Sequence, residues 1–492
     1  MQRKSIKLNT ILNTFRMALT VLIPLITFPY TSRVFLTQGS GKINFSNSVV
    51  QVFTLFASLG IYSYGIREGA KVRNNRAAFT KLAHELFFVN IVSTAVAYIV
   101  FFFCVFNLPS FQNYRTLLLI SSLNIGFTAL GLDWIYGVYE EYMYITVRQI
   151  VVQLFTIVSM LVFVHEPKDI YLWAFLTVIS SVGANIFNFI HARKYLDYIP
   201  FRIDRKAVLI HLMPILILFS TQLAAKVYLN LDTILLGVMT TDHNTGLYSA
   251  AVKLNTILIT CFTAMSPVFV PRIVEYLKND RKEEYYELLK KIFRLVLSLG
   301  IPAVVGIEML GDQIIRLLAG DAFIEAGKTI RILAPIILIT ACVNILYYDV
   351  LVPNGKEKKV LTCTVSAAAV NLVTSCLLIP RLLQNGAAIG SIIAEICGLV
   401  LALLFCIRQD SGIKKSIPKI TNYIIGSVGI GAVCFITEKL ISNYIYQIIL
   451  GIGLSVAVYA LVLIITKDPM YVEAKGILIQ RRRNVEVRRT KT

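Results

Sequence analysis

The sequence contains few charged residues and leaves little room for a water-soluble domain. Charged residues make up only 15% of its 492 residues, whereas hydrophobic residues make up 56%, and the mean hydropathy is +0.70. A soluble domain carries about 25% charged residues. A membrane-spanning helix needs about 20 predominantly apolar residues, so the chain has room for about fourteen spans. The composition therefore predicts an all-α integral membrane protein with many spans.

The sequence also lacks the motifs of common catalytic and metal sites. It contains no HExxH, GxSxG or paired Cys/His pattern, and its eight cysteines form no CxxC pair. The cysteines are therefore expected to pack as small apolar side chains. The segment 322–329 ends like a phosphate-binding loop but lacks the first glycine, and it falls on the side of the membrane where ATP is absent. No connection between spans is long enough for a catalytic domain, which predicts a protein that is not an enzyme and has no resident metal or cofactor.

Apolar segments separated by polar breaks predict about fourteen membrane spans. The first segment is longer than the hydrophobic part of a signal peptide and has no cleavage pattern, so it is expected to remain as the first span. The predicted spans are residues 10–34, 44–65, 84–106, 116–137, 145–164, 170–191, 208–238, 246–270, 292–312, 329–352, 360–380, 386–407, 420–438 and 446–466.

Basic residues gather in alternate connections, which predicts the orientation of the chain. Short cytoplasmic connections are enriched in Lys and Arg. With the N-terminus inside, the cytoplasmic side receives most of the basic residues, and an even number of spans returns the C-terminus to that side. The basic tail 480–492 could suggest nucleic acid, but a segment held by anionic lipid headgroups explains it better. Membrane lipids are therefore an expected partner, and nucleic acid is not.

Two glycines at matched positions indicate an internal repeat. Gly41 opens the second span and Arg67 closes it 26 residues later, and the same 26 residues separate Gly246 from Arg272 in the eighth span. This offset predicts two parallel, pseudo-symmetric six-helix lobes, an arrangement known from secondary transporters that bind substrate between the lobes. The predicted organisation is an N-terminal lobe at 1–191, a basic linker at 192–207, a C-terminal lobe at 208–407, and two further helices with a basic tail at 408–492.

Several charged side chains fall inside the predicted spans, where charge is costly and commonly marks a pathway or a partner. Lys226 and Asp232 share the seventh span, about 9 Å apart along the axis and roughly 120° apart around it, so they cannot form an i, i+4 pair. Asp232 and Lys253 lie at equal depth on neighbouring antiparallel helices. They either pair as a structural bridge or serve separate roles. Lys226 has no obvious partner in the sequence.

Three other charged residues have more ambiguous positions. Arg16 lies nine residues after Lys7 and either extends to the inner surface or faces a water-filled, cationic space that it shares with Lys226. Such a space suits an anionic headgroup. Asp133 and Asp349 fall close to cytoplasmic ends of spans, where an interfacial position is expected.

Several stretches together resemble the polysaccharide, or O-antigen, lipid flippases. Leu132–Arg148 resembles the signature of their fourth and fifth spans, and Asp232–Gly237 followed by Gly246–Lys253 resembles their seventh-to-eighth hairpin. Asn371, Ile379-Pro380 and Asn385–Glu395 resemble their eleventh and twelfth spans. The resemblance covers nearly the whole chain in the right order. The family belongs to the superfamily that also contains multidrug extruders and peptidoglycan-precursor flippases.

The resemblance implies a fold and a function. The fold would be a two-lobed, V-shaped transporter of about fourteen helices in a bacterial plasma (inner) membrane. The function would be movement of undecaprenyl-diphosphate-linked oligosaccharide, an O-antigen or capsule unit, from the cytoplasmic to the outer face, with polysaccharide polymerase machinery as a further partner. On this resemblance the residues expected to hold diphosphate or sugar acids are Arg16, Lys226, Lys253 and, near the outer rim, Arg33. A coupling cation, sodium or a proton, would use Asp232, Asn371 and Glu395.

Alternating access is the mechanism that these features favour, with the headgroup crossing a central cavity while the lipid tail stays in the bilayer. A negative cell interior drives an anion outward by about 2.3 kcal/mol per charge per 100 mV. Two alternatives remain. A cation-coupled multidrug antiporter of the same fold would have an acidic cavity, whereas the span charges here include at least three cations. A membrane polysaccharide polymerase usually has a long outer connection, and the longest outer connection here, at 311–328, is modest.

Overall fold

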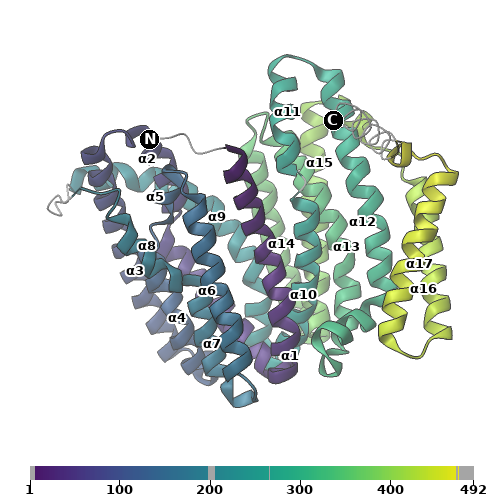
Figure 1. Cartoon of the computed structure of the whole chain (residues 1–492), viewed down its shortest axis with the longest axis horizontal. Helices are drawn as coiled ribbons and strands as arrows, with labels where there is room; N and C mark the ends of the chain where they lie inside the picture. The colour runs from purple at the N-terminus through teal and green to yellow at the C-terminus, as the bar shows by residue number, and fades with distance from the viewer. Residues whose placement is uncertain (1–5, 198–204, 265, 473–474, 476–492) are drawn as a thin grey trace, which may run out of the picture. The chain divides into compact units, whose positions relative to one another are not determined.

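The protein is described by a computed structural model over residues 6–197, 205–264, 266–472 and 475. These residues form helices joined by short connections, with no β-strand among them (Figure 1). The predicted all-α class is confirmed. The helices separate into two compact units, which share the long helix α14.

The described part of the first unit lies within residues 1–249 and 375–387. Its elements are α1 (Ile6–Ser58), α2 (Ile61–Val72), α3 (Arg76–Asn107), η1 (Pro109–Tyr114), α4 (Arg115–Leu130), α5 (Asp133–Val138), α6 (Tyr142–Phe163), η2 (Pro167–Asp169), α7 (Ile170–Val178), η3 (Ile179–Gly183), α8 (Ala184–Ala192) and α9 (Arg205–Met239).

The second unit contains residues 250–374 and 388–492, again within the described part of the chain. Its elements are α10 (Asp242–Thr263), whose first residues belong to the first unit, α11 (Ser266–Lys278), α12 (Lys282–Ala319), η4 (Asp321–Phe323), α13 (Ala326–Asn344), η5 (Ile345–Leu351), α14 (Glu357–Leu382), α15 (Gln384–Gln409), η6 (Ser411–Ser416), α16 (Thr421–Leu440) and α17 (Tyr444–Ile465). The last two helices, α16 and α17, pack against each other as a hairpin (Figure 1).

Ten helices in the described part of the chain are long and apolar enough to cross a membrane, or eleven if the bent pair α10 and α11 counts as one span. The predicted count of fourteen is therefore not confirmed. Two predicted spans share α1, which is divided by a non-helical residue, Leu36 (φ 54°). The predicted span 116–137 is broken after Leu130, because Leu132 adopts a left-handed conformation and α5 starts anew at Asp133.

Several helices extend beyond the apolar segments that predict them. α3 starts at Arg76 rather than at residue 84, and α12 runs from Lys282 to Ala319 rather than from 292 to 312. Hydropathy marks only the part of a helix that suits hydrocarbon, whereas the backbone hydrogen bonds continue into the polar surroundings. The positions of the spans in the sequence are thus predictable, but their ends are not.

The helix α9 packs against α1, α2 and α3 and lies in the first unit. Part of this packing is a chain of polar side chains that joins three helices. Glu85 of α3 is buried and accepts a hydrogen bond from His211 Nε2 of α9 at 3.0 Å, and the hydroxyl of Tyr64 of α2 lies 2.7 Å from His211 Nδ1. The predicted C-terminal lobe starts at residue 208, whereas α9 belongs to the first compact unit. The compact units and the predicted lobes therefore divide the chain at different places.

The two glycines that mark the internal repeat meet in the first unit. A Cβ added at Gly41 would lie 1.9 Å from the main-chain oxygen of Asp242, and a Cβ added at Gly246 would lie 2.0 Å from the main-chain oxygen of Thr37. Thr37 and Asp242 each stand four residues before the glycine of their own helix. The contact is therefore reciprocal, as expected where two equivalent segments cross about a local two-fold axis. Only glycine allows the two backbones to approach this closely.

Candidate transport site

Lys226 is an exposed side chain on α9, within one of the most apolar regions of the sequence. No ion pair joins it to another residue whose side chain the structure describes. The neighbouring Asn230 is buried and donates a hydrogen bond to the main-chain oxygen of Lys226 at 2.9 Å, which fixes this turn of the helix without using the ammonium group. The ammonium group is thus available to an anionic ligand.

The other predicted cations lie in different surroundings. Arg33 is an exposed residue of α1 and donates to the main-chain oxygen of Pro29 at 2.7 Å. Lys253 is partly buried on α10, in the second unit. Arg16 lies on α1, but its side chain is outside the part of the structure that is described. The grouping of the four cations around one cavity stays a prediction.

Asp232 is buried in the first unit and accepts two hydroxyl hydrogen bonds from other helices. Tyr248 of α10 donates to Oδ2 at 2.9 Å, and Ser375 of α14 donates to Oδ1 at 2.7 Å. Hydrogen bonds to an ionised acceptor are roughly twice as strong as neutral ones, so these donors stabilise the carboxylate. Carboxylate and hydroxyl oxygens are also ligands that hard cations prefer. The arrangement suits either a structural role or ion binding.

The partners of Asp232 were not among the predicted site residues. Tyr248 lies inside the stretch Gly246–Lys253 that carries the family resemblance, and Ser375 lies one turn after Asn371 on the same helix. The sequence did contain a signal for Ser375, because a residue four positions after Asn371 lies on the same face of the helix. Asn371 is fully buried on α14 and Glu395 is half-buried on α15, both in the second unit. The proposed ion site stays a prediction.

The extracytoplasmic end predicted for α9 and α10 carries further polar contacts in the first unit. Tyr114 of η1 donates to the carboxylate of Asp242, the first residue of α10, and Thr37 bonds the His243 ring at 2.8 Å. Burial, together with the neighbouring carboxylate of Asp242, raises the pKa of Tyr114. The phenol therefore stays protonated and keeps its role as a donor. The first contact joins α10 to η1, and the second joins α10 to α1 next to the reciprocal glycine crossing.

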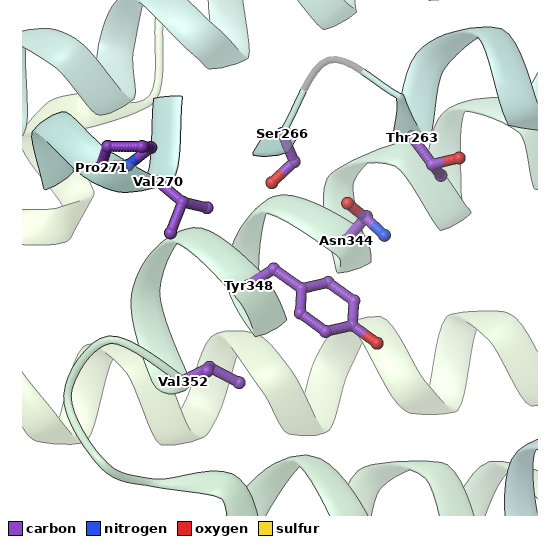
Figure 2. A pocket seen from close by; sticks show the side chains of 7 residues that line it. All are labelled: Thr263, Ser266, Val270, Pro271, Asn344, Tyr348 and Val352. Atoms are coloured by element: carbon purple, nitrogen blue, oxygen red, sulfur yellow. The ribbon is translucent and has the colours of Figure 1, made fainter. Parts of the chain in front are cut away.

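The second unit contains a cavity of about 410 Å³ where two helices are interrupted (Figure 2). One interruption separates α10 from α11, and the other is the π-helical segment η5, a type of distortion that is frequent at functional sites. Figure 2 shows the side chains that line the cavity, namely Thr263, Ser266, Val270, Pro271, Asn344, Tyr348 and Val352.

Asp349 lies next to this cavity and is fully buried within the protein. Its predicted depth near the membrane interface stays a prediction. The hydroxyl of Ser266, which lines the cavity, donates to Asp349 Oδ1 at 2.7 Å. Asp133 in the first unit is different, because its side chain is 43% exposed and contacts both Asn188 (2.6 Å) and Arg148 (3.6 Å). Position relative to the end of a span does not distinguish the two, since burial depends on the neighbouring helices.

No group of three or more His, Cys, Asp or Glu side chains that could hold a metal ion occurs among the described residues. The site features are instead an exposed lysine within an apolar helix, a buried hydrogen-bonded aspartate and a cavity at broken helices. In a helical protein with many spans, charged residues within the spans commonly mark a transport pathway, which makes a membrane transporter the class that these features favour.

Comparison with known proteins identifies the family. Residues 6–277, more than half of the chain, match the family model described as polysaccharide biosynthesis protein, and the chain belongs to this family. A candidate O-antigen transporter from Shigella dysenteriae is 22% identical over 79% of the chain and 95% of its own length. A candidate flippase, AglR, from Haloferax volcanii is 24% identical over 35% of the chain and 37% of its own length.

Solved structures show the same fold at low sequence identity. The lipid II flippase MurJ, in an inward closed conformation, superposes with a TM-score of 0.75 at 15% identity and covers 94% of the chain and 99% of its own length. An inward-facing multidrug resistance transporter of the MATE family has a TM-score of 0.61 at 11% identity, over 80% of the chain and 99% of its own length. The predicted transporter fold is confirmed, and the predicted family is confirmed by the sequence match.

Proposed function

We propose that this protein is a flippase that moves polyprenyl-diphosphate-linked oligosaccharide from the cytoplasmic to the outer face of a bacterial plasma membrane. Family membership and the names of the relatives support the substrate class. The observation that carries the proposal is Lys226, an exposed ammonium group without an ion-pair partner among the described side chains, in the middle of an apolar helix. A buried or lipid-flanked cation needs an anionic partner, and a diphosphate headgroup supplies one.

The transport cycle is proposed to be alternating access. The sugar and diphosphate cross through the protein, and the polyprenyl chain stays in hydrocarbon. A cation at Asp232 would return the unloaded carrier to its inward-facing state rather than pull the lipid outward. Both termini are proposed to lie in the cytoplasm, because the basic connections are concentrated on that side.

The proposal predicts that Lys226→Ala lowers transport while the protein still folds. The test uses purified protein in liposomes with a fluorescent undecaprenyl-diphosphate sugar, and it measures the fraction of label protected from a membrane-impermeant quencher. Loss of one charge-assisted contact is worth about 1.5 to 3 kcal/mol, so the initial rate should fall roughly 10-fold to 100-fold. Lys226→Arg should retain most of the rate, because the positive charge remains.

The matched control is Lys168→Ala, which removes an exposed lysine that pairs with Glu166 at 2.7 Å in a connection between spans. This variant should transport at the wild-type rate. Equal rates for Lys226→Ala and the wild type would contradict the proposed diphosphate contact. Efflux of cationic drugs that persists in Lys226→Ala, without movement of the lipid-linked sugar by the wild type, would favour the multidrug antiporter instead.

A further inference from the structure

Asp349 has an unusual set of neighbours for a buried acid. Its side chain is fully buried in η5, and Ser266 donates to Oδ1, but Oδ2 is buried without a hydrogen-bond partner. The described ion pairs do not include Asp349. The cost of leaving an ionised carboxylate without a cation in an apolar interior is several kcal/mol. The neutral acid avoids most of this cost, because a proton on Oδ2 removes the charge.

Among the described side chains that contact Asp349 there is no cation. On α12, the phenol of Tyr285 lies 3.4 Å from the main-chain oxygen of Asp349, and on α15 the thiol of Cys406 contacts the main-chain oxygen of Leu346 at 3.8 Å. Neither group carries a positive charge. α11 carries three charged residues, and all three are exposed, namely Arg272, Glu275 and Lys278. On α13 and η5 themselves the titratable neighbours are Cys342, Tyr347 and Tyr348.

Ser266 connects this carboxyl group to the cavity. Its hydroxyl lines the cavity on one side and donates to Asp349 Oδ1 on the other, and Thr263, Asn344 and Tyr348 place further polar groups on the cavity wall (Figure 2). A hydroxyl group both donates and accepts hydrogen bonds, so it can pass a proton between a cavity water and the carboxyl group. The cavity, of about 410 Å³, is lined mainly by apolar surface, so water would enter it only next to polar side chains such as that of Ser266.

We propose that Asp349 is a proton-binding site of the second unit, loaded and unloaded through Ser266 from the adjacent cavity. In loading, an O–H bond of a hydronium ion breaks, an O–H bond forms on the Asp349 carboxylate, and a neutral water remains. The carboxyl group changes from charge −1 to 0. The ionised form needs a polar partner for Oδ2, whereas the neutral form suits the buried position that Asp349 has in the structure. This inference adds a proton site to the cation proposed at Asp232. It rests on the proposed flippase function only for its role in transport.

Infrared spectroscopy of the full-length protein in lipid nanodiscs tests the site without any substrate. The pH is titrated, and the carbonyl stretch of protonated carboxylic acids is recorded for the wild type and for Asp349→Asn. We expect a titrating component in the wild type, beyond the bands of the carboxyl groups common to both proteins, that is missing from Asp349→Asn. The matched control is Asp133→Asn. Asp133 is also predicted close to the cytoplasmic end of a span, but it has Arg148 as a neighbour. This variant should keep the band.

Two results would overturn the proton site. One is a titrating band of equal size in the wild type and Asp349→Asn. The other is a carboxylate band that responds to sodium and not to pH, which would indicate a metal cation in place of a proton. If Asp349→Asn does not fold, Ser266→Ala provides the test, because removal of the donor to Oδ1 must shift the pH at which the band titrates. An unchanged titration in Ser266→Ala would contradict the connection through the cavity.

Transport measurements separate this inference from the proposed function. Asp349→Asn mimics the neutral acid permanently, so its rate of lipid-linked sugar movement should lose the pH dependence of the wild type, while Asp133→Asn keeps it. If the infrared band titrates as expected but no lipid-linked sugar moves through the wild type, the proton site stands and the proposed flippase function fails. If the sugar moves but Asp349→Asn retains the full pH profile, the flippase stands and the role of the proton in transport fails.

Discussion

At the scale of the residue, three aspartates of this protein are distinguished by their partners. Asp232 receives two hydroxyl donors, Asp133 contacts an amide and a guanidinium group, and Asp349 receives one hydroxyl while one of its oxygens has no partner. Each set of partners favours a different charge state, because donors and cations stabilise the carboxylate and burial without them does not. The three acids are therefore expected to respond differently to the same Asp→Asn substitution.

The hydroxyl of Tyr248 is predicted to contribute to stability through Asp232. Tyr248→Phe removes a donor to a buried carboxylate, and hydrogen bonds to charged groups are worth about 1.5 to 3 kcal/mol. We expect a loss of that size in the free energy of unfolding, measured by denaturant titration in mild detergent. In the background of Asp232→Asn the same substitution should cost less, because the acceptor is no longer charged. Tyr446→Phe, at an exposed tyrosine of α17, should change stability by less than about 0.5 kcal/mol. Equal losses in both backgrounds would contradict the pairing.

At the scale of the element, close backbone approach determines where the helices of the first unit cross. Gly41 and Gly246 leave no space for a side chain at the crossing of α1 and α10, and the obstructing atoms are main-chain oxygens that cannot rotate away. Gly237 is similarly covered by the ring of Phe45, with only 2.1 Å between an added Cβ and the nearest ring carbon. The hairpin of α9 and α10 thus approaches α1 closely at three glycine positions.

Gly246→Ala is predicted to destabilise the protein by separating the two backbones. Overpacking of a well-packed contact costs about 1 to 3 kcal/mol. The control is Gly453→Ala on α17, where no atom lies within 4 Å of an added Cβ. There the substitution should be neutral or stabilise by about 0.5 to 1 kcal/mol, since alanine favours the helix over glycine. Thermal unfolding of both variants in the same detergent measures the difference. A Gly246→Ala protein as stable as Gly453→Ala would show that α1 and α10 do not approach closely in the membrane.

At the scale of the whole molecule, the proposed flippase needs no ATP because the membrane potential acts on its anionic substrate. A diphosphate moving outward from a negative interior gains about 2.3 kcal/mol per charge per 100 mV. Proton binding at Asp349 would add a second driving force that depends on the pH difference as well as on the potential. Transport by this protein is therefore expected to respond to pH in addition to potential.

Imposed potentials test the electrical part. In liposomes with a potassium gradient and an ionophore, 100 mV that is negative on the cytoplasmic side should favour the outer leaflet by about 2.3 kcal/mol for each charge that moves, or roughly 50-fold in the final distribution. The distribution of the fluorescent lipid-linked sugar is measured at several potentials and constant pH. Reversal of the potential should reverse the preferred leaflet. A distribution indifferent to the potential would mean that the headgroup crosses without net charge movement.

The sequence by itself determined the all-α membrane class, the positions of most spans, the family and the presence of Lys226 and Asp232 in an apolar helix. Local hydropathy suffices for the class and the spans, since hydrocarbon excludes most charged side chains and requires internally bonded backbones. The family follows from particular stretches of sequence. Only the tertiary structure decided where helices break, as at Leu36 and Leu132, and which distant hydroxyls contact Asp232. It also decided that Asp349 is buried while Asp133 is partly exposed. Burial and hydrogen bonding depend on helices far apart in the chain, and the order of residues along one helix carries no direct record of them.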